Sequence, residues 1–259
     1  MDANFLTFTH QLVDVAGDII RPYFGAHGVV KLKADESPVS RADREAEAAI
    51  RMLIATRCPD HGIYGEEYGQ QATNKKYVWV IDPIDGTRAF LAGGQEWGTL
   101  IALCEDGVPI LGILNQPITG ERWVGARGTE TIYYRHSSEG IKTKTRTCPT
   151  LASANISTTS RNYFTPPQAS AFVKLAEQCG EVIENGDCYA YGLLARGMRD
   201  VVVDAGLKPY DILALVPIIE GAGGRITGWD GSALTLSNYR DVVAVGDEGL
   251  AEVCRLLRP

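Results

Sequence analysis

The segment at residues 82–87 reads Asp-Pro-Ile-Asp-Gly-Thr and has two carboxylates three residues apart. Pro83 stiffens the backbone and Gly86 gives it freedom, so Asp82 and Asp85 can point into one cavity. Hard divalent cations such as Mg²⁺ prefer oxygen ligands, and Ile84 can add its backbone carbonyl. The segment predicts a magnesium site, although taken alone it is as typical of a simple acidic turn.

A helix start at residues 86–91 directly follows the two aspartates. The free backbone N–H groups near Gly86 and Thr87 would form a seat for a phosphate. A metal site beside a phosphate seat is the equipment for attack by metal-activated water on a phosphoryl group. The predicted strand at residues 77–81 would hold this loop in place.

Three more carboxylates fall at places where they could join the loop. Glu66 follows a short apolar strand, Asp211 stands at a helix start, and Asp43 lies three residues after Ser40. Each also has a structural interpretation. Glu66, with Glu67, could lie on a solvated face, Asp211 could be a helix N-cap, and Asp43 could be the partner of Ser40 in a capping box.

The elements around these residues follow from apolar spacing. Helical periodicity predicts helices at residues 4–24, from residue 40, and at 166–178, 189–195, 211–222 and 248–257. Short apolar runs predict strands at residues 77–81, 98–104, 110–115, 122–126, 201–204 and 242–245. Glu105, Asp106 and Gly107 indicate a hairpin between two of the strands.

This order predicts a mixed α+β and α/β fold. We expect a layered αβαβα sandwich with an N-terminal antiparallel-sheet half at residues 1–147 and a C-terminal α/β half at residues 148–259. Residues 137–147 form the polar boundary, as a loop or an exposed strand.

Composition excludes several classes of protein. A formal net charge of −7 and a pI near 5.2 argue against a nucleic-acid partner. No apolar run reaches the length of a membrane span, and the N-terminus lacks the pattern of a signal peptide. Six scattered cysteines without a C-x-x-C pair are typical of reduced thiols. We therefore expect a soluble, cytoplasmic protein. No G-x-G-x-x-G follows a strand, which argues against an NAD-type oxidoreductase.

Taken together, the motifs resemble the inositol monophosphatase family. They are Gly-Glu-Glu at 65–67, Trp-Val-Ile-Asp-Pro-Ile-Asp-Gly-Thr at 79–87, and Tyr-Asp at 210–211 with Gly-Ala-Gly-Gly at 221–224. They match in order and spacing over nearly the whole chain. The resemblance implies two or three Mg²⁺ ions per site and a homodimer. The implied metal ligands are Glu66, Asp82, Asp85, Asp211 and the backbone oxygen of Ile84.

The resemblance also implies a mechanism. Asp43 would orient Thr87, and these two residues with Glu66 would hold a water for in-line attack on the phosphate. Asp85, Gly86, Thr87 and Asp211 would contact the substrate. A non-catalytic regulatory homologue is an alternative, but none of the expected acidic positions is missing.

Several stretches look most like the histidinol-phosphate phosphatase branch of this family, at residues 86–90, 98–103, 112–117, 121–123 and 186–191. Histidinol phosphate carries an ammonium and an imidazole, so its pocket should hold carboxylates beyond those that bind metal. By the resemblance, Asp187 and Asp204 fall at sugar-contacting positions, and Asn185 could hydrogen-bond the imidazole. The structural alternatives are a helix N-cap for Asp187 and a strand-end turn for Asp204. The runner-up substrates are inositol 1-phosphate and other sugar or nucleotide phosphates.

Overall fold

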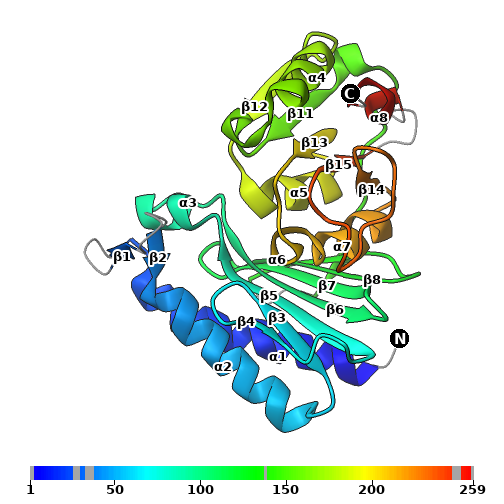
Figure 1. Ribbon diagram of the computed structural model, residues 1–259. Helices are drawn as coiled ribbons and strands as arrows, with labels where there is room; N and C mark the ends of the chain where they lie inside the picture. The colour runs from blue at the N-terminus through cyan, green and yellow to red at the C-terminus, as the bar shows by residue number, and fades with distance from the viewer. Residues whose placement is uncertain (1–2, 26–29, 33–37, 137–138, 247–251, 258–259) are drawn as a thin grey trace.

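Five layers of secondary structure form the molecule, as seen in the computed structural model, which describes residues 3–25, 30–32, 38–136, 139–246 and 252–257 (Figure 1). Helices α1 (Ala3–Ile20) and α2 (Arg41–Arg57) cover one face of a large sheet. Three short helices lie between this sheet and a smaller one, and two more cover the outer face of the smaller sheet. This order confirms the expected αβαβα sandwich.

The large sheet has eight strands in the order β10-β9-β8-β7-β6-β5-β3-β4. All neighbouring pairs are antiparallel except β3 and β5, which run parallel. Its strands are β3 (Gly62–Gly65), β4 (Gly69–Gln71), β5 (Tyr77–Asp85), β6 (Gly98–Glu105), β7 (Val108–Gln116), β8 (Glu121–Ala126), β9 (Ile132–Arg135) and β10 (Ile141–Lys142). The sheet is therefore mixed, with one parallel pair in the predicted antiparallel half.

The smaller sheet has five strands in the order β12-β11-β13-β15-β14. Strand β11 runs parallel to β12 and β13, and the other pairs are antiparallel. Its strands are β11 (Asn155–Thr158), β12 (Glu181–Glu184), β13 (Val201–Asp204), β14 (Arg225–Gly228) and β15 (Val242–Val245). Both sheets are mixed, and the division of the chain at residue 147 stays a prediction.

The remaining elements are short. They are β1 (Val30–Leu32), β2 (Pro38–Ser40), α3 (Thr87–Ala92), α4 (Pro166–Ala176), α5 (Asp187–Ala195), α6 (Pro209–Ile212), α7 (Leu215–Gly221), α8 (Glu252–Leu257) and 3-10 turns at Arg21–Tyr23, Leu151–Ser153 and Arg161–Tyr163. None of the described helices is long and apolar enough to cross a membrane.

Two of the predicted elements differ in the structure. The helix expected at residues 211–222 is divided into α6 and α7, with Pro217 in the first turn of α7. Proline has no N–H to donate and fits only the first turn of a helix, which favours a break before it. Strand β5 continues through Asp82 to Asp85, where its register with β6 shifts, instead of ending at Ile81. The side chain of Ser40 is not described, so the expected capping bond between Ser40 and Asp43 stays a prediction, and the expected helix start at residue 248 lies outside the described residues.

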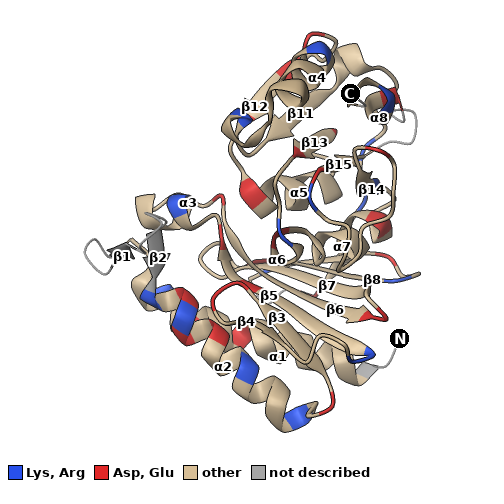
Figure 2. Ribbon diagram, in the orientation of Figure 1, with Lys and Arg blue, Asp and Glu red and all other residues tan. Residues whose placement is uncertain are grey.

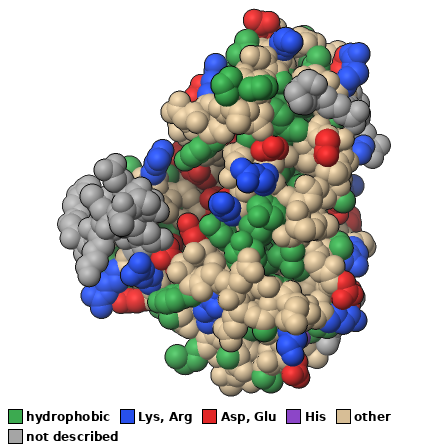
Figure 3. Space-filling model, in the orientation of Figure 1, with side chains coloured by type: hydrophobic (Ala, Val, Ile, Leu, Met, Phe, Trp, Pro, Cys, Tyr) green, Lys and Arg blue, Asp and Glu red, His purple; other side chains and the backbone are tan. Residues whose placement is uncertain are grey.

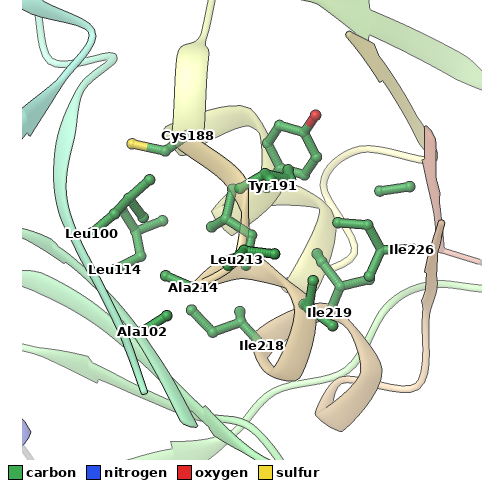
Figure 4. Close-up of a cluster of buried hydrophobic side chains, with 14 of the residues drawn as sticks. Leu100, Ala102, Leu114, Cys188, Tyr191, Leu213, Ala214, Ile218, Ile219 and Ile226 are labelled. Atoms are coloured by element: carbon green, nitrogen blue, oxygen red, sulfur yellow. The ribbon is translucent and has the colours of Figure 1, made fainter. Parts of the chain in front are cut away.

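Three buried apolar clusters hold the layers together. One lies between the large sheet and α1 and α2, and another lies between the smaller sheet and α4 and α8. The central cluster joins the two halves, with Leu100 and Leu114 of the large sheet facing Leu213, Ile218 and Ile219 (Figure 4). This central cluster fixes how the two halves face each other.

Helix α7 lies unusually close to the large sheet. A Cβ on Gly112 of β7 would lie 1.9 Å from the carbonyl oxygen of Ala214, and one on Gly125 of β8 would lie 2.3 Å from that of Pro217. Only glycine at these two positions leaves room for the helix backbone.

Candidate active site

The acidic loop is fixed by its own hydrogen bonds. The Ile84 N–H donates to Asp82 Oδ1 at 3.0 Å, and the Thr99 hydroxyl donates to the Pro83 carbonyl at 2.8 Å. Asp82 is 2% exposed, while the Asp85 side chain is only partly buried. Both carboxylates are thus set at the end of a central strand with little freedom to move.

Asp211 reaches the same place from the other half of the chain. It lies in α6, and its Oδ2 accepts the Lys208 backbone N–H at 2.8 Å. Lys208 is the N-cap of α6 and Asp211 is its third residue, so the N-cap interpretation of Asp211 is wrong, although its carboxylate does bond to the backbone at the helix start. At the same time, carboxylate oxygens of Asp82, Asp85 and Asp211 lie within 4.8 Å of one another. The structure brings these three predicted ligands together.

Glu66 sits on the turn after β3, where its N–H donates to the Ile81 carbonyl at 3.2 Å. Glu47 of α2, a fully buried residue that the sequence patterns did not single out, holds the next part of this turn. Its Oε2 accepts the Glu67 N–H at 2.8 Å, and its Oε1 accepts the Tyr68 N–H at 3.2 Å. A Cβ on Gly65 would lie 2.0 Å from Glu47 Oε1, so a side chain there would displace the Glu47 carboxylate. Glu47 therefore positions the turn that carries Glu66.

We expect Glu47→Gln to raise the KM for Mg²⁺ by about tenfold while kcat changes less, because partners of ligand-bearing groups tune metal affinity to this extent. Glutamine replaces one acceptor oxygen by an NH₂ group, which cannot accept a backbone N–H. The measurement is activity against Mg²⁺ concentration. The matched control is Glu45→Gln, a change on the more exposed side of the same helix. Equal Mg²⁺ dependence of the two variants would contradict the role of Glu47.

The carboxyl groups of the site lie so close together that their pKa values are raised. Burial, followed by the charges of Glu66, Asp85, Asp211 and Asp43, raises the pKa of Asp82 well above its usual range. Burial and the neighbouring carboxylates raise the pKa of Asp85 as well, and burial is the largest cause that raises the pKa of Asp211 to about 7. A bound cation would relieve this repulsion.

The donor set fits a hard cation. All candidate ligand atoms are carboxylate or carbonyl oxygens, which is what Mg²⁺ prefers. The nearby Cys188 thiol is a weak competitor, because burial raises its pKa well above the usual range and keeps it protonated. Glu66, Asp82, Asp85 and Asp211 are therefore chemically suited to hold magnesium.

The backbone at Gly86 and Thr87 forms the helix start that we predicted as the phosphate seat. Gly86 is left-handed, with φ 89°, at the N-terminus of α3, and a Cβ there would lie 2.8 Å from the Glu96 carbonyl oxygen. The Thr87 hydroxyl donates to the Ile84 carbonyl at 3.1 Å. Asp43 is 2% exposed in the first turn of α2 and, like Thr87, lines the larger of the cavities described below. The pairing of Asp43 with Thr87 stays a prediction.

The start of α5 reaches across to the acidic loop. The Cys188 N–H donates to Asp85 Oδ2 at 2.7 Å. The three residues before it, Asn185, Gly186 and Asp187, all have positive φ, at 74°, 128° and 39°. Gly186 is the N-cap and no side chain caps this helix, so the N-cap interpretation of Asp187 is wrong. Asp187 lines both cavities of the site instead, and Asn185 is exposed and lines the larger one.

Asp204 is more deeply buried than we expect for a side chain that contacts the substrate. It is 3% exposed, and both of its carboxylate oxygens are hydrogen-bonded. Oδ1 accepts the Thr159 N–H at 2.7 Å and Oδ2 accepts the Tyr191 hydroxyl at 2.9 Å. It still lines the smaller cavity, at the end of β13. A direct contact of Asp204 with substrate stays a prediction.

Two adjoining cavities, of about 1030 and 480 Å³, open between the halves. They share Glu66, Asp85, Gly86, Thr87 and Asp187, so they form one site. Figure 2 shows acidic positions where the start of α5 faces the β5–α3 loop. Figure 3 shows acidic side chains inside the hollow between the halves.

Among the lining residues that no sequence motif singled out, Arg88 and Tyr163 stand out. Arg88 is exposed in the larger cavity, beside the phosphate seat. Its charge opposes the burial and the Asp204 charge that raise the pKa of Asp187 to about 6. Tyr163 lines both cavities from the smaller-sheet half. Arg88 directly follows the recognised loop and could have been noticed, whereas no motif marks Tyr163.

Several known proteins are similar to this chain in sequence and in structure. The chain is 43% identical over 256 residues to the bifunctional phosphatase IMPL2 of Arabidopsis thaliana, covering 95% of this chain and 72% of that protein. It is 35% identical over 216 residues to a histidinol-phosphatase of Chlorobaculum parvum, covering 83% and 82%. The structure of an inositol monophosphatase from Zymomonas mobilis superposes with a TM-score of 0.89 at 44% identity, covering 99% of each chain.

The family model of the inositol monophosphatases matches residues 1–258. The match spans both sheets and every acidic residue described above. This protein belongs to the inositol monophosphatase family and is a hydrolase of phosphate monoesters.

Proposed function

We propose that this enzyme hydrolyses L-histidinol phosphate to L-histidinol and phosphate with Mg²⁺ as cofactor. The observation that carries the substrate proposal is Asp187, whose carboxylate has no hydrogen-bond or ion-pair partner among the described residues and lines the cavity beside the phosphate seat. A carboxylate left over beside the metal ligands suits the ammonium or the imidazole of histidinol phosphate. The relationship to the Chlorobaculum parvum histidinol-phosphatase supports the same substrate.

In the proposed reaction, bound Mg²⁺ supplies positive charge for the phosphate oxygens and acidifies the attacking water. Two or three ions would be held by Glu66, Asp82, Asp85, Asp211 and the Ile84 carbonyl. Because the Cys188 N–H and the Lys208 N–H each bond one of these carboxylates, the ligands are oriented before substrate arrives.

Residues of the β5–α3 loop bind the phosphate and orient the water. Backbone N–H groups at Gly86 and Thr87 steady the phosphate oxygens, and Thr87 with Asp43 and Glu66 orients the water for in-line attack. Asp187 and Asn185 bind the cationic end of the substrate, and Asp204 supports that wall of the cavity through Tyr191 and Thr159.

The deciding experiment is a phosphate-release screen with L-histidinol phosphate, inositol 1-phosphate and adenosine 3′,5′-bisphosphate, with and without Mg²⁺. We expect kcat/KM to be highest for histidinol phosphate and activity to vanish in EDTA. A tenfold or greater preference for inositol 1-phosphate would instead assign the runner-up substrate.

Asp187→Asn tests the substrate-binding role itself. We expect the KM for histidinol phosphate to rise by about tenfold or more, since a charge-assisted contact in a partly buried site is lost. The KM for inositol 1-phosphate should change little, because that substrate has no cation to bind. Glu181→Gln, which removes a charge at an exposed position of β12 outside both cavities, is the control. Equal losses on both substrates would show that Asp187 has a structural role.

A further inference from the structure

Tyr163 is a large aromatic side chain exposed at the mouth of the site. It is 51% exposed, and its side chain has no hydrogen bond and no ring contact with another described residue. Yet it lines both cavities together with Asp187 and Thr159. An exposed aromatic ring in a cavity that must bind a ligand is a candidate for ligand contact.

The turn that carries Tyr163 is held firmly. In this 3-10 turn, Arg161–Tyr163, the Tyr163 N–H donates to the Ser160 carbonyl at 3.3 Å. On one side, Arg161 pairs with Glu184 of β12 at 2.8 Å. On the other side, the Phe164 ring packs against Phe172, with the ring centroids 5.1 Å apart. The turn thus has contacts on both sides of Tyr163, while the Tyr163 ring stays available.

This turn also lies beside the segment that leads to Asp211. A Cβ on Gly206 would meet the Tyr163 carbonyl oxygen at 4.0 Å. Residues 205–208 line the smaller cavity and lead into α6, which carries Asp211. The ring therefore belongs to the C-terminal wall of the site, across from the phosphate seat on the β5–α3 loop.

We propose that Tyr163 is a specificity-determining residue that stacks on the imidazole ring of the leaving group. This inference rests on the proposed function. An imidazole or imidazolium ring is planar and polarisable, and an aromatic face attracts both stacked rings and cations. A saturated polyol offers neither feature. Tyr163 would thereby favour a phosphate ester whose leaving group carries an imidazole ring over a sugar phosphate, without touching the reacting phosphate.

The test compares Tyr163→Ala and Tyr163→Phe on histidinol phosphate and on glycerol 2-phosphate, whose leaving group is neither aromatic nor cationic. We expect Tyr163→Ala to raise the KM for histidinol phosphate by about five- to tenfold, the range of one aromatic or cation–π contact, with kcat within about twofold. Tyr163→Phe should behave like the wild type, because the ring and not the hydroxyl makes the contact. Kinetics on glycerol 2-phosphate should not change.

The control is Val173→Ala on α4, which also shortens an exposed apolar side chain, 43% exposed, but outside both cavities. If the wild type hydrolyses histidinol phosphate and Tyr163→Ala leaves its KM unchanged, or raises both KM values equally, only the stacking inference is overturned. If the wild type does not hydrolyse histidinol phosphate at all, the proposed function and the inference fall together.

Discussion

Replacing Asp85 by asparagine is expected to lower kcat/KM by about a thousandfold or more, because a metal site contributes several kcal/mol of transition-state stabilisation. The change removes the charge of a carboxylate that lies within 4.8 Å of Asp82 and Asp211. It removes almost no volume, and the amide oxygen of asparagine can still accept the Cys188 N–H. The fold should therefore survive. Phosphate release at saturating Mg²⁺ measures activity, and near-UV circular dichroism measures the fold.

A matched control is Asp18→Asn on α1, the same chemical change at a side chain that is 74% exposed. It should keep wild-type kinetics. Near-normal turnover of Asp85→Asn at saturating Mg²⁺ would remove Asp85 from the metal site, and loss of the near-UV signal would show that the residue acts on folding.

Magnesium is expected to raise the midpoint of thermal unfolding by about 5–10 °C. Binding at about 100 times Kd stabilises the native state by about 2.7 kcal/mol, and about 1 kcal/mol shifts the midpoint by about 2–4 °C in a chain of this size. The physical reason is the crowded set of carboxylates, whose mutual repulsion a divalent cation neutralises. The measurement is thermal unfolding in EDTA and in a series of Mg²⁺ concentrations.

Two controls separate specific binding from screening. Sodium chloride at matched ionic strength should shift the midpoint much less. Any salt screens exposed charges, whereas the cluster of Asp82, Asp85 and Asp211 needs a coordinating cation. Asp85→Asn should lose most of the magnesium-induced shift. Equal shifts with both salts would argue against a built metal site.

Features that depend on nearby residues could be predicted from the sequence. The acidic loop and the hairpin at Asp106 and Gly107 are encoded by adjacent residues, and the central strands are encoded by short apolar runs. The pattern predicts no strand at β11 (Asn155–Thr158) or β12 (Glu181–Glu184), because these short strands mix polar and apolar residues. Their pairing is set by long-range contacts that leave little local trace.

In the candidate site, carboxylates could be found because a charged side chain in a motif is conspicuous. The donors that orient them could not, since the amides of Cys188 and Lys208 are backbone groups that every non-proline residue has. The same holds for Glu47, which has the periodicity of an ordinary helix residue yet lies fully buried beneath the Glu66 turn.

The tight seating of α7 on Gly112 and Gly125 makes these glycines spacers for the site. Asp211 lies on α6, directly before α7, whereas Asp82 and Asp85 belong to the sheet on which α7 rests. One added methyl group beneath α7 would push that helix outward, and the third carboxylate would move with it. Gly112 and Gly125 thus set the distance between Asp211 and the two aspartates of the sheet, although neither glycine belongs to the metal site.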